Sequence, residues 1–176
     1  MLYLTFDAGY ENGCTEKILD TLQKHNVKAA FFLVGNYIEK NADLVRRMTE
    51  EGHIVGNHTM HHLQGRDTTC RRYLRDVAEA DALIGSPLFR PPHGIMRWSQ
   101  AAALKHRYNI IMYDVVTRDY SRRMKPRDVL ENVRRYVRSG SIIVFHDSLK
   151  ARDNMLWALP RAIRWLRRQG YSFGTL

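Results

Sequence analysis

Apolar positions along the chain follow two periods, and these periods predict alternating strands and helices. Short runs that are apolar throughout, or at every second residue, are typical of buried strands. Longer segments repeat their apolar positions every three or four residues, as an amphipathic helix does. Strands are predicted at residues 3–6, 28–34, 53–56, 88–89, 109–113, 142–145 and 171–173.

The predicted helices lie between these strands, and several have recognisable boundaries. Thr15 is expected to cap the first helix, while Asn41 caps the second and Gly52 ends it. Pro126 suits the first turn of a later helix. Helices are predicted from Thr15, from Asn41, from about residue 70, over residues 99–106, from Pro126, and from about residue 155 to residue 169.

The repeated order of strand and helix predicts an α/β fold with a largely parallel sheet, either open or closed into a (β/α) barrel. A length of 176 residues suits one domain with a sizeable core. No linker, low-complexity tract or internal repeat divides the chain, so residues 1–176 are predicted to form a single domain. Pro91 and Pro92 require a fixed turn after residues 88–89.

Composition changes this picture mainly through charge. The chain has 28 lysines and arginines against 18 aspartates and glutamates, a formal net charge of +10. A solvated helix face is the favoured explanation, although a basic surface also attracts nucleic acid, anionic lipid or acidic wall polymers. No RNA-binding or zinc-finger signature favours a specific nucleic acid, and no apolar run is long enough for a membrane span.

The start of the chain reads as a strand and lacks the charged start and small-residue cleavage site of a signal peptide. The protein is therefore expected to be either cytoplasmic or a mature or trimmed domain. Cys14 and Cys70 are far apart in the sequence and form no metal motif. One disulfide and two free thiols are both compatible with this spacing, and the oligomeric state stays open.

Ionisable side chains gather where the predicted strands end. In parallel α/β folds the carboxyl ends of the strands form one rim, and active sites lie there. Core packing would not place ionisable groups at five such ends. The residues concerned are Asp7, His58, Arg90, Asp114, Asp119, and the pair His146 and Asp147.

His58 and His62 are the clearest candidates for metal binding. At a separation of four residues, two imidazoles share one face of a helical turn and can bind one metal ion. Because a single pair at this spacing is weak support, a structural or surface pair of histidines stays open as the alternative. His61 is offset from that face and is a weaker ligand candidate.

Each of the other candidates has a functional and a structural interpretation. Asp7 either takes a proton from water or stabilises a turn before Gly9. Arg90, ahead of a rigid Pro-Pro turn, either pairs with a carboxylate or is an ordinary surface arginine. His146 either donates a proton at its strand end or is a satisfied core histidine. Tyr120 is either a rim aromatic that stacks on a sugar or a core residue.

Five motifs resemble those of the NodB-type polysaccharide deacetylases, carbohydrate esterase family 4, and follow that family's order. Together they span nearly the whole chain, and five in order at strand ends are far more specific than any one alone. The family's fold is a distorted parallel (β/α) barrel, in agreement with the predicted elements. The matching segments are residues 5–9 (TFDAG), 58–62 (HTMHH), 90–94 (RPPHG), 119–120 (DY) and 144–146 (VFH).

The resemblance implies hydrolysis of an N-acetyl group on a sugar, which releases acetate and leaves an amine. It also implies a divalent metal ion, Zn²⁺ or Co²⁺, that polarises the amide carbonyl. Asp7 is implied as the general base on a water at the metal, Arg90 as the residue that orients it, and His146 as the acid for the leaving amine. The remaining implied roles are metal ligation by His58 and His62, oxyanion stabilisation by the backbone amide of His93, and an acetyl-methyl pocket at Val144.

Two positions depart from the family's pattern. Ala8 stands where the family has an aspartate that binds the metal, so two neutral imidazoles and water are expected to hold the metal more weakly. Val116 stands where the fourth motif begins with an aspartate that tunes the catalytic histidine. Asp114 and Asp119 are the candidates to replace that aspartate, although neither lies at the family's position.

A subgroup of the family departs at both positions, namely the deacetylases that act on muramic acid during δ-lactam formation in peptidoglycan. Residues 5–13 and 152–173 resemble that subgroup, whereas residues 62–65 and 145–148 are more like generic bacterial deacetylases. Peptidoglycan, at N-acetylmuramic acid or N-acetylglucosamine, is therefore the expected substrate, and the cell envelope the expected location. The alternatives are chitin-like oligosaccharides as substrate, or a catalytically silent glycan-binding protein that lost its metal ligand at Ala8.

Overall fold

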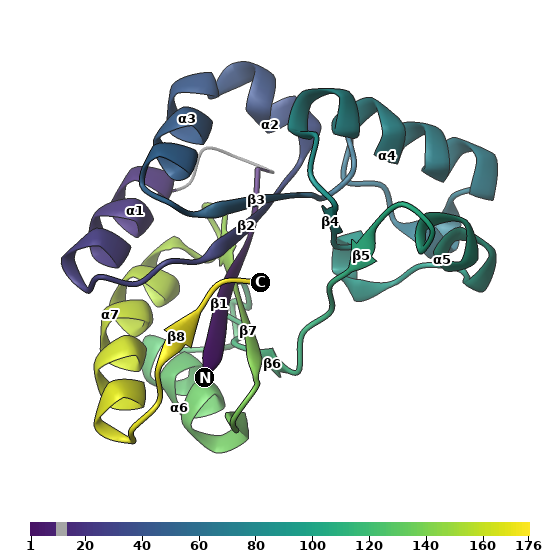
Figure 1. Cartoon of the computed structure of the whole chain (residues 1–176). Coiled ribbons are helices and arrows are strands. Elements are labelled where there is room, and N and C mark those ends of the chain that lie inside the picture. Colours follow the sequence, from purple (N-terminus) through teal and green to yellow (C-terminus); the bar gives the residue numbers. More distant parts are fainter. Residues whose placement is uncertain (10–13) are drawn as a thin grey trace.

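The computed structural model describes residues 1–9 and 14–176, in which a parallel sheet is surrounded by helices (Figure 1). The strand order is β5-β4-β3-β2-β1-β7-β6, and β8 pairs with the start of β1. Within the described residues no ladder joins β5 to β6, so the sheet is an incomplete barrel, which confirms the predicted distorted parallel (β/α) barrel. The strands are β1 (Leu2–Ala8), β2 (Ala30–Leu33), β3 (Ile54–Asn57), β4 (Leu88–Phe89), β5 (Asn109–Ile110), β6 (Val115–Val116), β7 (Ile142–Asp147) and β8 (Phe173–Gly174).

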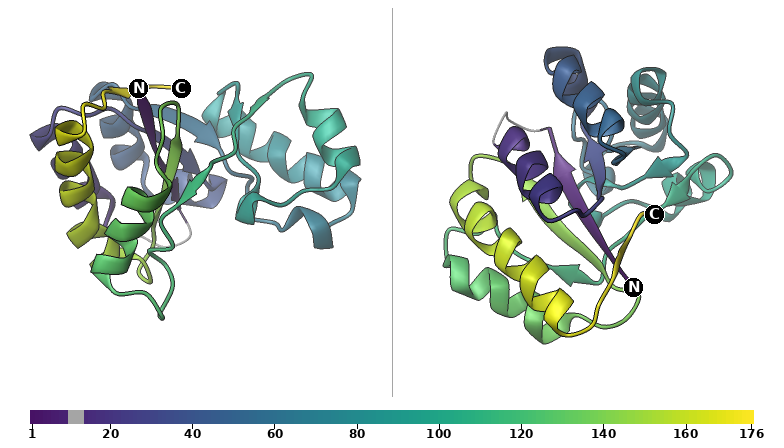
Figure 2. Two further views of the ribbon diagram at one scale, coloured as in Figure 1. Left: turned by 90° about the horizontal axis from the view of Figure 1, so that it is seen from below. Right: turned by 60° about the vertical axis from the view of Figure 1, so that its left-hand side comes forward.

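Helices connect the strands and cover the outside of the sheet (Figure 2). α6 and α7 pack against each other, and α1 contacts the other side of α7. In the described part of the chain, no helix combines the length and the apolar character needed to cross a bilayer. The helices are α1 (Thr15–Lys24), α2 (Gly35–Lys40), α3 (Ala42–Glu50), α4 (Cys70–Ile84), α5 (Trp98–Leu104), α6 (Pro126–Tyr136) and α7 (Arg152–Arg168), with single 3₁₀ turns at η1 (Gly65–Asp67) and η2 (Pro92–Gly94).

The main core is centred on three aromatic rings of neighbouring strands. Phe6 on β1 stacks on Phe31 of β2 and on Phe145 of β7, with ring centroids 5.0 and 5.9 Å apart. All three side chains are fully buried, and burying a ring of this size contributes roughly 2 kcal/mol. This core holds the central strands in a fixed relation, so the groups at their carboxyl ends are also fixed relative to one another.

The structure differs from the predicted elements in two places. Residues 35–40 form α2, which is too short to show a helical repeat of apolar positions. The strand predicted at residues 109–113 ends at Ile110, and β6 is a separate strand. The early end has a physical cause, because the carbonyl groups of Ile111 and Met112 accept hydrogen bonds from the side chain of Arg90.

The N-terminus of α1 is capped by a residue from a distant strand. Cys14 occupies the N-cap position, so the expectation that Thr15 caps this helix was wrong. Asp147, at the end of β7, accepts hydrogen bonds from the backbone N–H of Cys14 at 2.9 Å and from the Thr15 hydroxyl. Cys14 and Cys70 are both free thiols, so the alternative of a disulfide between them is excluded.

Asn41 occupies the N-cap position of α3, as predicted, but its side chain does not cap the helix. Its amide instead donates to the carbonyl oxygen of Tyr37 at 3.0 Å. The side chain therefore ties α3 back to α2, which the sequence pattern did not predict.

Candidate active site

Polar side chains meet at the carboxyl rim of the sheet, as predicted. Asp7 on β1 and His146 on β7 are direct partners in the parallel ladder. Their side chains therefore leave the sheet on the same face, next to each other. His58 and Arg90 come directly after β3 and β4, the strands that continue the sheet beyond β2.

Asp114 was expected at this rim, and that expectation was wrong. Since the strand before it ends at Ile110, Asp114 directly precedes β6 instead of following a strand. Its carboxylate accepts hydrogen bonds of 2.8 Å from the Ser141 hydroxyl and from the N–H of Ile142, at the amino end of β7. Asp114 therefore lies at the opposite end of the sheet from His146.

Arg90 is fully buried and holds Asp7 in one orientation. One guanidinium nitrogen donates to Oδ1 of Asp7 and to the hydroxyl of Thr5, at 2.8 Å each. The guanidinium carbon lies 4.1 Å from the ring centroid of Phe32, and Nε donates to the carbonyl oxygen of Ile111 at 3.1 Å. Arg90 is therefore a carboxylate partner and not a surface arginine.

His58 is buried and has one ring nitrogen without a hydrogen-bond partner. Its Nδ1 lies 2.7 Å from the carbonyl oxygen of Arg90, and because a carbonyl can only accept, Nδ1 carries the proton. Nε2 then has a lone pair, and it is buried, 3.8 Å from Oδ2 of Asp7. A buried polar atom without a partner is rare in native structures. A histidine fixed through Nδ1 by a carbonyl is the usual arrangement of a metal ligand.

Residues 58–62 form an irregular loop, so the helical turn expected from the spacing of four was wrong. Thr59 and His62 have φ angles of 67° and 56°, which are incompatible with a right-handed helix. The rings of His58 and His62 nevertheless meet, with centroids 5.1 Å apart, and the ring of His93 lies 4.8 Å from that of His62. Two imidazoles on one tetrahedral metal ion have centroids roughly 5 Å apart, given metal–nitrogen bonds of about 2 Å.

His61 turns toward α4 and away from this pair. Its Nδ1 is 2.6 Å from Oδ1 of Asp76, whose Oδ2 accepts the backbone N–H groups of Met60 and His61 at 3.0 Å each. Among the residues that the structure describes, His61, Asp76 and Glu79 are the one group of three or more His, Cys, Asp or Glu side chains whose ligand atoms all lie within 4.8 Å of one another. Because Asp76 already accepts these bonds, we interpret it as the clamp that holds the loop of residues 58–62 on α4.

His146 is held by Asp119 through both its backbone and its ring. The N–H of His146 donates to one carboxylate oxygen of Asp119, and its Nδ1 lies 2.8 Å from the other. Asp119 is fully buried, whereas Tyr120 is exposed with its ring centroid 4.6 Å from that of His146. Of the two aspartates considered as replacements at the fourth motif, Asp119 is therefore the one that contacts the histidine.

The surroundings give Asp7 and His146 opposite preferences for a proton. Burial by itself would raise the pKa of Asp7, but the basic groups around it, His58, Arg90 and His146, outweigh burial and lower that pKa. Burial would lower the pKa of His146, but the hydrogen bond and charge of Asp119 outweigh it and raise that pKa. Burial, more than the neighbouring histidines, lowers the pKa of His62 to about 3. Asp7 is thus ionised near neutral pH, and His62 is neutral.

The other predicted positions lie around this centre. Val144 is fully buried two residues before His146, on the same face of β7. Ala8 packs in the main core, opposite Asp147 in the ladder, and has no ligand atom. His93 is exposed in η2 with a φ of 60°. Residues 10–13, part of the segment that resembles the δ-lactam subgroup, lie outside the described residues.

Two contributors to the site were missed from the sequence. Thr5 accepts a hydrogen bond from the same guanidinium nitrogen of Arg90 as Asp7 does. Because Thr5 lies two residues before Asp7 on one strand, the sequence could have placed both side chains on the same face. Asp76 has no such signal. Its contact with the loop depends on how α4 docks, which residue spacing does not encode.

Comparisons with known proteins show the family to which the chain belongs. The family model described as polysaccharide deacetylase matches residues 1–110, more than half of the chain. The chain is 32% identical over 185 residues to the peptidoglycan-N-acetylmuramic acid deacetylase PdaA of Bacillus subtilis strain 168, covering 99% of this chain and 69% of that protein. The chain belongs to the polysaccharide deacetylase family, as the five motifs predicted.

Two solved structures share the fold. The peptidoglycan N-acetylglucosamine deacetylase Bc1960 superposes with a TM-score of 0.91 at 31% identity, covering 99% of this chain and 85% of that one. A mutant of BA3943, a family 4 pseudoenzyme with restored enzymatic activity, gives a TM-score of 0.85 at 29% identity, covering 100% of this chain and 65% of that one. The fold neighbours thus include a protein named as a deacetylase and one named as a pseudoenzyme.

Proposed function

We propose that the protein is a metal-dependent N-deacetylase that removes acetyl groups from the sugars of peptidoglycan and releases acetate. One observation carries this proposal: the ionised Asp7 and the proton-holding His146 stand side by side, next to the unpartnered Nε2 of His58. Membership of the family and likeness to named peptidoglycan deacetylases support the substrate class. Action on peptidoglycan would take place outside the cytoplasmic membrane.

His58 and His62 would hold a divalent metal ion, Zn²⁺ or Co²⁺. When bound, the ion supplies a Lewis acid for the acetamide carbonyl and for water. The buried Nε2 of His58 fits this role, because it has a lone pair and no hydrogen-bond partner. Ala8 adds no ligand atom, so the metal would be held more weakly than by two histidines and a carboxylate.

Asp7 would take the proton of the attacking water, and His146 would give a proton to the leaving amine. Arg90 bonds Oδ1 of Asp7 and so leaves Oδ2 for the water. Asp119 occupies Nδ1 of His146, which leaves Nε2 as the proton donor. The backbone N–H of His93 would donate to the oxyanion.

Tyr120 and Val144 would contact the sugar and the acetyl methyl group. The exposed ring of Tyr120 lies at the edge of His146 and offers a face for stacking on a sugar. Val144, buried on the same strand face as His146, would form the apolar end of the acetyl pocket.

The direct test is acetate release with Zn²⁺ or Co²⁺ added. Peptidoglycan and chitohexaose are the two substrates, and mass analysis of the digested peptidoglycan shows whether muramic acid or glucosamine has lost its acetyl group. We expect release from peptidoglycan, and a loss of at least about a hundredfold in His58→Ala and in Asp7→Asn. His106→Ala, an exposed histidine after α5, is the matched control. Folded protein that releases no acetate from either substrate would refute the proposal.

A catalytically silent glycan-binding protein is the second candidate. The missing carboxylate at Ala8 and the likeness to the BA3943 pseudoenzyme favour it. Ala8→Asp separates the two functions. Acetate release that appears only in this variant would make the natural protein a binder, whereas release by the parent protein establishes the enzyme.

A further inference from the structure

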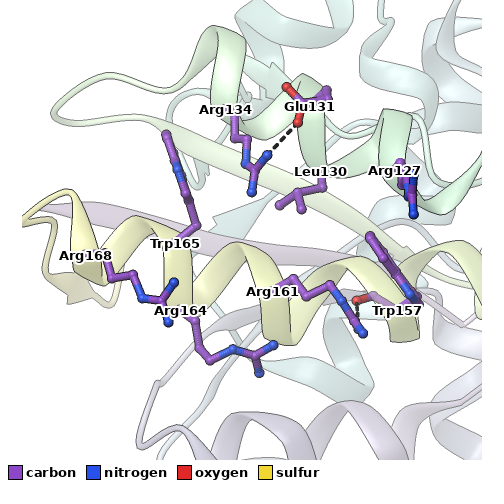
Figure 3. A pocket seen from close by; sticks show the side chains of 9 residues that line it. All are labelled: Arg127, Leu130, Glu131, Arg134, Trp157, Arg161, Arg164, Trp165 and Arg168. Atoms are coloured by element: carbon purple, nitrogen blue, oxygen red, sulfur yellow. Dashed lines mark hydrogen bonds and ion pairs between the residues drawn. The ribbon is translucent and has the colours of Figure 1, made fainter.

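A strongly basic groove runs between α6 and α7 (Figure 3). It has a volume of about 400 Å³ and is lined by nine side chains, five of them arginines and two of them tryptophans. One leucine and one glutamate complete the lining. Neither the proposed catalytic residues nor the five family motifs include any of these nine positions.

The spacing of these residues shows that each helix turns a single face to the groove. On α6, Arg127, Leu130, Glu131 and Arg134 repeat every three or four residues. Leu130 is buried and forms the floor. On α7, the lining residues run from Trp157 to Arg168 with the same repeat. The arginines are therefore concentrated on facing surfaces of two packed helices instead of being scattered over solvated faces.

Carboxylates within the protein do not neutralise this groove. Glu131 pairs with Arg134 at 2.6 Å. Within the described residues no ion pair joins Arg127, Arg164 or Arg168 to an acidic side chain. Like charges gathered in a concave surface repel one another and raise the local concentration of anions. Arginine, moreover, recognises carboxylate and phosphate groups through paired hydrogen bonds.

Two tryptophans give the groove flat apolar surfaces beside these charges. Figure 3 shows Trp157 and Trp165 toward opposite ends, with Arg161 between them. The guanidinium carbon of Arg161 lies 4.0 Å from the ring centroid of Trp157, and its Nη1 donates to the Trp157 carbonyl at 2.9 Å. Half-buried indoles beside guanidinium groups suit a ligand that alternates flat faces with negative charges.

The direction of the groove relates it to the active site. α7 begins shortly after β7 ends, and α6 follows β6, so both helices start at the rim that carries the candidate active site. Arg127 lies in the first turn of α6, whereas Arg168 is the last residue of α7. From Trp157 to Arg168 the groove extends about 16 Å, given a rise of 1.5 Å per residue. That length suits an extended chain rather than a single small anion.

We infer that the groove between α6 and α7 binds an anionic sugar polymer, a glycan whose units carry carboxylate or phosphate groups. The negative charge of the ligand follows from the arginines, and the choice of a sugar rests on the proposed function. Bound there, the polymer would run along the helices toward the rim, which would keep the enzyme on a charged wall while it acts on neighbouring sugars.

Binding is measured by tryptophan fluorescence in a Trp98→Phe background, because Trp98 is 93% exposed on α5 and lies outside the groove. The probes are hexagalacturonate, an oligomer of hexoses linked by phosphodiesters, neutral cellohexaose and the deoxythymidine hexamer. None of them carries an N-acetyl group, so the result is independent of deacetylase activity. We expect saturable binding of hexagalacturonate, of the phosphodiester-linked hexose oligomer or of both, and none of cellohexaose. Comparison of the two anionic probes distinguishes carboxylate from phosphate as the recognised group.

The matched variants are Arg164→Gln/Arg168→Gln in the groove and Arg71→Gln/Arg72→Gln on α4, which remove the same charge from exposed positions. We expect the dissociation constant to rise about tenfold in the first pair and less than about twofold in the second. Circular dichroism checks that both pairs are folded. Equal losses in the two pairs, or no binding of either anionic sugar probe, would overturn the inference. Tighter binding of the deoxythymidine hexamer with a loss specific to the groove would assign it to single-stranded nucleic acid instead.

Discussion

One ring nitrogen of His58 is central to the proposed metal site. Its Nδ1 is held by the carbonyl of Arg90, and its Nε2 is buried beside Asp7 without a hydrogen-bond partner. Removal of this imidazole deletes one of two proposed ligands, so His58→Ala should weaken Zn²⁺ binding about a hundredfold, measured by isothermal titration calorimetry. His106→Ala is the control and should bind Zn²⁺ as the parent does. Unchanged affinity in His58→Ala would remove His58 from the metal site.

The carboxylate of Asp119 is expected to set the alkaline limit of activity. Its hydrogen bond and charge raise the pKa of His146 against the opposing effect of burial. The ring of Tyr120 also contacts that of His146. The charge of Asp7 further raises the pKa of His146, whereas the charge of Arg90 lowers it. His146 donates only while protonated, so activity should fall as pH rises through its raised pKa. In Asp119→Asn that pKa should fall, which moves the alkaline limb of kcat/KM to lower pH.

The measurement for this change is an NMR titration of the His146 ring together with the pH profile of kcat/KM. At neutral pH we expect a loss of roughly tenfold to a hundredfold. Asp114→Asn is the matched control, since Asp114 bonds Ser141 and Ile142 at the opposite end of the sheet. An alkaline limb that moves in the control but not in Asp119→Asn would contradict the assignment.

For single residues, the sequence predicted well which side chains would belong to the candidate site, and predicted less well which contacts they would make. The spacing of His58 and His62 predicted that a helical turn would place their rings side by side. The rings do meet, but residues 58–62 form a loop with two positive φ angles instead of a helical turn. Asp114 and Asp119 were both considered from the sequence as replacements for the missing aspartate of the fourth motif, although only Asp119 matches a position of that motif. They are five positions apart, and only the position of β6 between them places one at each end of the sheet.

Among the elements, α1 depends on a cap supplied from β7. Asp147 accepts hydrogen bonds from Cys14 and Thr15, and it is buried. Asp147→Ala leaves the N–H of Cys14 without this acceptor and leaves the Thr15 hydroxyl only its contact with the Tyr37 hydroxyl, so we expect a loss of about 2 kcal/mol or more in the free energy of unfolding.

Urea unfolding followed by circular dichroism measures this effect. Asp128→Ala is the comparison, because Asp128 caps α6 through the N–H of Lys125 at 2.8 Å but is exposed. It should cost less, about 0.5–1 kcal/mol, since water replaces the lost acceptor. Equal losses in the two variants would show that burial of the Asp147 cap adds nothing.

Most elements were predicted close to their observed positions, because each carries its own apolar period. Exceptions were α2 and β6, which are too short to show a period, and the end of β5. There the carbonyl groups of residues 111 and 112 bond Arg90, a residue about twenty positions earlier. A local pattern cannot report a hydrogen bond of that kind.

Across the whole molecule, the sheet and the main core extend from one terminus to the other. β1 pairs with β8, and a single cluster of buried residues includes both Leu2 and Leu166. The predicted single domain therefore leads to one cooperative transition on heating. Far-UV circular dichroism, which reports all helices, and tryptophan emission, from Trp98 on α5 and two residues on α7, should have the same midpoint. Two separate midpoints would instead indicate two independently unfolding parts.

Local sequence was sufficient for the class of fold, for the family and for most of the candidate site residues. Apolar periods and turn residues act between near neighbours, and the five motifs are contiguous. Packing alone decided which aspartate supports His146, how the rings of His58 and His62 meet, and that Asp147 caps α1. It also brought the arginines of α6 and α7 to face one groove. Most of these features join residues far apart in the chain, and the energies of all of them depend on burial and distance, which exist only once the sheet and its helices have packed around the core.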